Sequence, residues 1–192
     1  MAQHDDDGLW VFGTRELARR PGTMRTLHRC VQAPDPLGTD VIAIPAGAPV
    51  DVALTLESVV EGVLATAQVS ATAVGVCVRC LDEVTRGVDV RAQELFAYPD
   101  RAAHHAQHDA QGTSEEQPYE LRDDTIDLET VVRDVVVTAL PFQPTCRPDC
   151  PGLCAQCGAR LAEDPEHAHD VVDPRWAALA DLAGGNPTQR RT

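Results

Sequence analysis

The chain contains no lysine, and all sixteen of its basic residues are arginine, against thirty aspartate and glutamate residues. The formal net charge is −14, which argues against a protein that binds nucleic acid over its whole surface. Aromatic residues are also scarce, at 4% of 192 residues, so the core must come mainly from valine, leucine and alanine. The length suits one domain of ordinary size, or one domain with a small metal module.

Two further absences concern the compartment. No apolar stretch approaches the roughly 18 residues that a membrane span needs. The N-terminal M-A-Q-H-D-D-D-G lacks the basic start and apolar run of a secretory signal. The seven cysteines are odd in number, which fits a reducing compartment better than a framework of disulfides. We therefore expect a cytoplasmic protein.

The middle of the chain has the pattern of β-strands. Apolar residues alternate with polar or small ones from Val50 to Glu57 and again from Val84 to Arg91, the period-2 signature of half-buried strands. This predicts an antiparallel β-meander of three or four strands between Pro49 and Tyr98. From Thr125, expected as an N-cap, to Ala139 the spacing is helical. The expected fold class is α+β: an antiparallel β-meander with a few short helices and a C-terminal cysteine-rich zinc loop.

Composition divides the chain into five stretches. Residues 1–8 and 184–192 are expected to be disordered ends, and 99–124 an acidic mobile loop. Residues 9–98 should form a mainly antiparallel β body with a basic N-terminal segment. Residues 125–183 should form a helix and a zinc-loop region that pack on this body.

Four cysteines lie in the stretch Thr145–Gly158, which reads T-C-R-P-D-C-P-G-L-C-A-Q-C-G. Proline and glycine exclude a regular helix or a central strand here, but they allow a tight loop that turns several thiols toward one point. C-A-Q-C-G has the form of a zinc knuckle, whose final glycine permits a sharp turn. Disulfides would need an oxidising compartment, and exposed free thiols would invite oxidation. We predict one structural Zn²⁺ site with four ligands: Cys146, Cys150, Cys154 and Cys157.

The ligand set is open at one point. His167 and His169 follow in D-P-E-H-A-H-D, and imidazole is also a good zinc ligand. Either histidine could replace Cys146.

The other three cysteines are harder to assign. Cys77-Val-Arg-Cys80 is a second C-x-x-C. A redox role would want a helix N-terminus, which no helical pattern supplies, and a metal site would need two further ligands that are not nearby in sequence. A structural turn is favoured, with a second metal site as the alternative. Cys30 is expected to lie in the core.

One short segment, residues 15–29, is positively charged although the whole chain is acidic. It contains five arginines and one acidic residue, Glu16, which gives a local charge of +4. They are Arg15, Arg19, Arg20, Arg25 and Arg29. Guanidinium groups grip phosphate in a bidentate way, which would make this segment an RNA-binding patch. A solvated face paired with the abundant acids explains it equally well.

The order of these features resembles the YceD family, also described as large ribosomal RNA subunit accumulation proteins. The resemblance covers nearly the whole chain except the acidic loop and the ends, and it looks most like the actinobacterial branch. The matching stretches are W-V-F-G-T-R-E-L-A-R-R-P-G-T-M-R, E-G-V-L-A-T, C-V-R-C-L-D, D-L-E-T-V-V-R-D, L-P-F-Q-P-T-C-R-P-D-C-P-G-L-C-A-Q-C-G and D-P-R-W-A-A-L. Many zinc-type members carry C-x-C where this chain has His167-Ala-His169, and some members lack the cysteine loop. Zinc is thereby implied to stabilise the C-terminal region without performing the common function.

The resemblance implies a non-enzymatic accessory factor for biogenesis of the large ribosomal subunit. Such a factor would support accumulation or processing of large-subunit ribosomal RNA by binding that RNA or a ribosomal protein. No DNA, membrane or small-molecule partner is expected. The alternatives are a zinc-dependent hydrolase or nuclease, and a zinc-stabilised interaction module unrelated to ribosomes. Four thiols around zinc leave no position for a reacting water, and no carboxylate pair stands out for acid–base chemistry.

Overall fold

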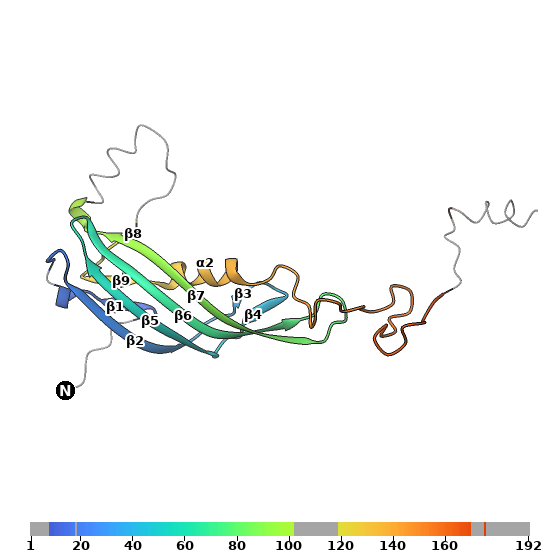
Figure 1. Cartoon of the computed structure of the whole chain (residues 1–192). Coiled ribbons are helices and arrows are strands. Elements are labelled where there is room, and N and C mark those ends of the chain that lie inside the picture. Colours follow the sequence, from blue (N-terminus) through green and yellow to red (C-terminus); the bar gives the residue numbers. More distant parts are fainter. Residues whose placement is uncertain (1–7, 18, 102–118, 170–174, 176–192) are drawn as a thin grey trace, which may run out of the picture.

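The computed structural model describes residues 8–17, 19–101, 119–169 and 175. A curled antiparallel β-sheet forms the body, and a helix packs against one of its faces (Figure 1). None of the helices in these described ranges is long and apolar enough to cross a membrane.

Four long strands lie side by side in the sheet, each antiparallel to its neighbour. In spatial order they are β2 (Met24–Gln32), β5 (Pro49–Ser58), β6 (Gly62–Val76) and β7 (Glu83–Ala97). Three short strands extend the sheet: β4 (Ile42–Ile44) on β6, β3 (Leu37–Gly38) on β4, and β8 (Tyr119–Glu120), parallel to β7. A separate two-stranded sheet pairs β1 (Val11–Gly13) with β9 (Thr125–Asp127).

The meander expected between Pro49 and Tyr98 is confirmed as β5, β6 and β7. In β5, buried and more exposed residues alternate along the strand. Val50, Val52, Leu54 and Leu56 are fully buried, while the residues between them are partly or fully exposed. Strand periodicity therefore sets which face of the sheet meets the core.

Strand β2 corrects the sequence interpretation of Cys30. The inner face of β2 carries Arg25, Leu27, Arg29 and Val31, so Cys30 points to the opposite, exposed face. Its expected burial is wrong, because neighbouring residues in a strand face opposite ways and the inward parity belongs to the odd-numbered positions.

Helix α2 (Glu129–Ala139) buries Val131, Val132 and Val136 against the sheet. It begins later than predicted, because Thr125 belongs to β9 and is not an N-cap. The Asp127 carboxylate instead accepts a hydrogen bond of 2.9 Å from the backbone N–H of Glu129, the first helical residue. A 3₁₀ turn, η1 (Arg15–Leu17), stands near the other end of the chain.

The region after α2 has neither long helices nor long strands within the described residues 140–169. It runs past the turn between β6 and β7 and then away from the sheet (Figure 1). Parts of the stretches expected to be disordered or mobile lie outside the described residues, namely 1–7, 102–118 and 184–192. The end of the expected acidic loop is ordered as β8, followed by the buried Leu121.

Candidate metal centres

Eight cysteine and histidine side chains form two clusters, and within each cluster the four ligand atoms lie within 4.8 Å of one another. We call Cys77, Cys80, Cys146 and Cys150 the inner cluster, and Cys154, Cys157, His167 and His169 the outer cluster. The inner cluster joins the β6–β7 turn to the loop after α2. The outer cluster is built from the C-terminal region alone.

The sulfur spacing of the inner cluster fits a tetrahedral thiolate site. The sulfurs of Cys77 and Cys150 are 3.8 Å apart, and those of Cys80 and Cys146 are 3.6 Å apart. Four sulfurs at about 2.3 Å from a central Zn²⁺ would be roughly 3.8 Å from each other. Three of the four residues are buried, and Cys146 is exposed.

The turns that present the two C-x-x-C pairs have the same backbone hydrogen bonds. In the first turn, the N–H of Leu81 donates to the Cys77 carbonyl (2.9 Å), and the N–H of Cys77 donates to Asp82 (2.7 Å). In the second, Gly158 donates to Cys154 (2.8 Å), and Cys154 donates to Ala159 (2.8 Å). We call these the first and second knuckles. Both therefore bring two thiols to one side of a tight turn.

Backbone donors favour the thiolate form of the first cysteine in each knuckle. Burial disfavours ionisation of Cys77, but N–H groups, among them those of Cys146 and Cys80, outweigh it and lower the pKa of the thiol to about 6. The N–H groups of Cys157 and Gln156 likewise lower the pKa of Cys154 to about 6. Thiolates are the form that binds metal.

Several hydrogen bonds hold the cysteine loop against the first knuckle. Arg79 donates to the Cys150 carbonyl (2.9 Å), and its own carbonyl accepts from the Leu153 N–H (3.1 Å). Arg160 forms a two-pronged pair with the Asp82 carboxylate, at 2.6 and 2.9 Å, and this pairing lowers the pKa of Asp82. Such contacts around a ligand set fix the orientation of its donors.

The outer cluster combines two thiols with two imidazoles. The Cys157 sulfur lies 3.1 Å from His167 Nε2 and 3.2 Å from His169 Nε2, and the two Nε2 atoms are 2.9 Å apart. Hydrogen bonds among these three atoms cannot pair all of them at once. A single cation could accept a lone pair from each of the three. The Asp164 carboxylate lies 3.9 Å from the other ring nitrogen of His167, beyond hydrogen-bond distance.

Residues 65–183 match the family model described as "Large ribosomal RNA subunit accumulation protein YceD". The chain belongs to the YceD family. An uncharacterized protein of Mycobacterium tuberculosis is 49% identical over 168 residues, which is 88% of this chain and 78% of that protein. An uncharacterized protein of Mycobacterium leprae is 43% identical over 172 residues, covering 90% and 76%. No solved structure matches the chain.

The structure distributes the four cysteines predicted as one site over both clusters. Cys146 and Cys150 join the first knuckle, and Cys154 and Cys157 join the two histidines. The two further ligands that the first knuckle needs are thus supplied from 66 and 73 residues away. Local spacing could not reveal this pairing. All eight ligand residues lie inside the segment that matches the YceD model.

The five arginines proposed as an RNA-binding patch precede the YceD-matched segment and do not share one surface. Arg25 and Arg29 point inward and donate to the carbonyls of Gly13 (3.4 Å) and Val11 (3.0 Å) in β1. The Arg29 guanidinium also lies 4.5 Å from the ring centre of Phe12. These two arginines therefore tie β1 to β2.

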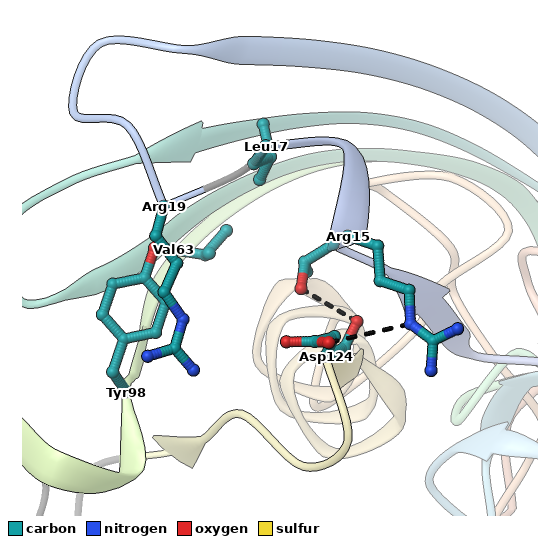
Figure 2. A pocket seen from close by; sticks show the side chains of 7 residues that line it. Arg15, Leu17, Arg19, Val63, Tyr98 and Asp124 are labelled. Carbon is teal, nitrogen blue, oxygen red and sulfur yellow. Dashed lines mark hydrogen bonds and ion pairs between the residues drawn. The ribbon is translucent and has the colours of Figure 1, made fainter.

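The remaining three arginines are exposed. Arg15 and Arg19 stand on either side of a cavity of about 220 Å³ (Figure 2). Arg15 lies 3.7 Å from the Asp124 carboxylate, and Arg19 lies 4.5 Å from the ring centre of Tyr98. Arg20 makes no ion pair within the described part of the chain. Only these three could contact a phosphate without disturbing β2.

Proposed function

We propose that this protein is a non-enzymatic accessory factor for biogenesis of the large ribosomal subunit. It supports accumulation or processing of large-subunit ribosomal RNA by binding that RNA or a ribosomal protein, and it acts in the cytoplasm. The observation that carries this proposal is the match of residues 65–183 to the YceD family model.

We further propose that each cluster holds one structural Zn²⁺. The donor chemistry supports zinc, because thiolate and imidazole are its common ligands and because each cluster offers four donors. The inner ion would fasten the cysteine loop to the β6–β7 turn, and the outer ion would close residues 154–169 into a compact lobe.

The closed ligand sets also favour a structural role over hydrolysis. Catalytic zinc keeps a position for water beside three protein ligands. Even the outer cluster, which contains two histidines, offers four donors and not three. They are Cys154, Cys157, His167 and His169. A zinc-dependent nuclease would require one of them to leave the metal.

Capture of the tagged protein from its own cytoplasm tests the proposed function. We expect large-subunit precursors or large-subunit ribosomal proteins to be recovered. Loss of these components after ribonuclease treatment would identify RNA as the direct contact, and survival would identify protein. Recovery of neither at low salt, with the bait abundant, would contradict the proposal.

A further inference from the structure

The cavity between Arg15 and Arg19 lies beside η1 (Figure 2), and we call it the η1 cavity. Its volume of about 220 Å³ is several times the roughly 30 Å³ that one water molecule occupies. Pockets that enclose a whole drug-sized ligand are typically about 300–1,000 Å³. The η1 cavity therefore suits one chemical group of a larger ligand.

Contacts between distant segments fix the walls of the η1 cavity. Thr14 donates to the Asp124 carbonyl through both its N–H (2.7 Å) and its hydroxyl (2.8 Å). The Tyr98 hydroxyl lies 3.2 Å from the buried Ser58 hydroxyl, which holds the ring in place. The cavity is therefore preformed, and a preformed site reduces the entropy lost when a ligand binds.

The guanidinium groups of Arg15 and Arg19 keep their hydrogen-bond donors available. The two side chains are 80% and 60% exposed. Their ion-pair partners, Asp124 and Asp100, lie 3.7 and 3.9 Å away, beyond hydrogen-bond distance. Neither guanidinium donates a hydrogen bond within the part of the chain that the structure describes, whereas the inward-facing Arg29 donates to a carbonyl. A ligand in the cavity would therefore find donors on two sides.

Arg19 has a backbone conformation that is uncommon for arginine. Its φ is 48°, in the left-handed region. The Arg19 guanidinium lies over the Tyr98 ring, 4.5 Å from the ring centre, and this contact orients the guanidinium plane at the cavity wall. Strained residues of this kind cluster at ligand-binding sites. The conformation is explained if the guanidinium must be held at this place.

The charges that line the η1 cavity favour an anion. Two guanidinium groups and one carboxylate, that of Asp124, give the lining a net charge of +1, in a chain that carries −14. Arg20, next to Arg19, is exposed and adds to the local positive charge. Because the Asp124 carboxylate would repel an anion, its neutralisation should tighten binding, whereas loss of either arginine should weaken it.

We propose that the η1 cavity binds one phosphate group of RNA, held between the guanidinium groups of Arg15 and Arg19. Guanidinium donates pairs of parallel hydrogen bonds to phosphate oxygens. The cavity chemistry selects phosphate, and the proposed function, on which this inference rests, selects RNA as its carrier. A single localised contact also agrees with the acidic chain, since the rest of the surface need not bind nucleic acid.

Variants that change one charge at a time test the cavity. Binding of a short labelled single-stranded RNA is measured by fluorescence anisotropy over a series of salt concentrations. Arg15→Gln and Arg19→Gln should each weaken binding roughly tenfold and reduce the slope of log K against log salt by about 0.7. Asp124→Asn should bind more tightly, and asparagine tolerates the left-handed backbone at this position, where φ is 58°.

Arg91→Gln is the matched control, because it removes an exposed charge on β7 that does not line the cavity. It should bind RNA like the unaltered protein, and all four variants should keep the melting temperature of that protein. Equal weakening by Arg91→Gln would show only diffuse attraction and would overturn the proposal. So would an Asp124→Asn variant that binds no more tightly, or a protein that takes up inorganic phosphate in calorimetry but binds no RNA.

Ultraviolet crosslinking followed by peptide mapping locates the contact. Adducts should fall on peptides that contain residues 14–20 or 98–101, and adducts confined to the region after α2 would overturn the proposal. If large-subunit precursors are captured equally well by the unaltered protein and by Arg15→Gln with Arg19→Gln, the cavity assignment is wrong and the proposed function stands. If no precursor is captured while the RNA assay behaves as expected, the phosphate site stands and the proposed function fails.

Discussion

At the scale of single residues, the arginines show how position within a strand decides the role of a charge. Arg29 lies on the inner face of β2, where its guanidinium contacts the Val11 carbonyl and the Phe12 ring. Arg20 carries the same charge a few residues earlier but is exposed. The first is part of the fold, whereas the second is available to solvent.

Replacing Arg29 with alanine should lower the free energy of unfolding by about 1–3 kcal/mol, because a charged hydrogen bond and a cation–π contact are both lost. Arg20→Ala should change it by less than about 0.5 kcal/mol. Urea denaturation of both variants measures the difference. Equal stabilities would show that Arg29 does not anchor β1.

Gly158 is the residue whose freedom the second knuckle requires. Its φ is 75°, and no atom stands within 4 Å of where a side chain would begin. Gly158→Ala should therefore cost about 1 kcal/mol through backbone strain alone. Isothermal titration should show metal affinity of the outer cluster reduced roughly fivefold. Unchanged affinity would mean that the turn adapts without strain.

At the scale of elements, the two candidate metal clusters join parts of the chain that differ in their separation along the sequence. The inner cluster ties the β6–β7 turn to a loop more than sixty residues later, with Cys77 and Cys150 separated by 73 positions. The outer cluster spans only residues 154–169. The two proposed metal sites share no residue, so removing one should leave the other intact.

The metal content of cysteine variants tests this arrangement. We expect about two Zn²⁺ per chain, as four donors in each cluster suit one ion. Cys77→Ser with Cys80→Ser should leave about one, and Cys154→Ser with Cys157→Ser should also leave about one. A single site of Cys146, Cys150, Cys154 and Cys157 would instead give one ion, unaffected by the first pair of substitutions. Elemental analysis of the purified proteins distinguishes the two patterns.

The sequence identified part of each centre. C-A-Q-C-G reveals the second knuckle because glycine follows its second cysteine, but Cys77-Val-Arg-Cys80 hides the first, because Leu81 stands where glycine is expected. Strand β2 was not anticipated either, since its inner face alternates arginine with apolar residues and the charges obscure the period. In both places the tertiary contacts override the local preference.

At the scale of the whole molecule, the main core and the metal region are separate. The large buried cluster around β5, β6 and α2 contains none of the eight ligands. A second small cluster groups Cys77, Cys80, Val84 and Cys150. The sheet is therefore held by apolar burial, whereas hydrogen bonds and the second small cluster join the described part of the C-terminal region to it.

Removing metal with a chelator should loosen one end of the molecule only. Amide hydrogen exchange should become faster in residues 144–161 and in the first knuckle, while β2 and β5 stay protected. The control is the same protein with zinc restored. Global loss of protection on chelation would contradict the separation of core and metal region.

The sequence by itself determined the alternating strands of the meander, the cysteine-rich loop as a candidate metal-binding element, and the resemblance to the YceD family. These properties are local, because strand period, knuckle spacing and motif order depend on near neighbours. Only the tertiary structure decided which cysteines meet and which arginines turn inward. Those outcomes depend on segments tens of residues apart that the curled sheet brings to one end, and no local pattern encodes that distance.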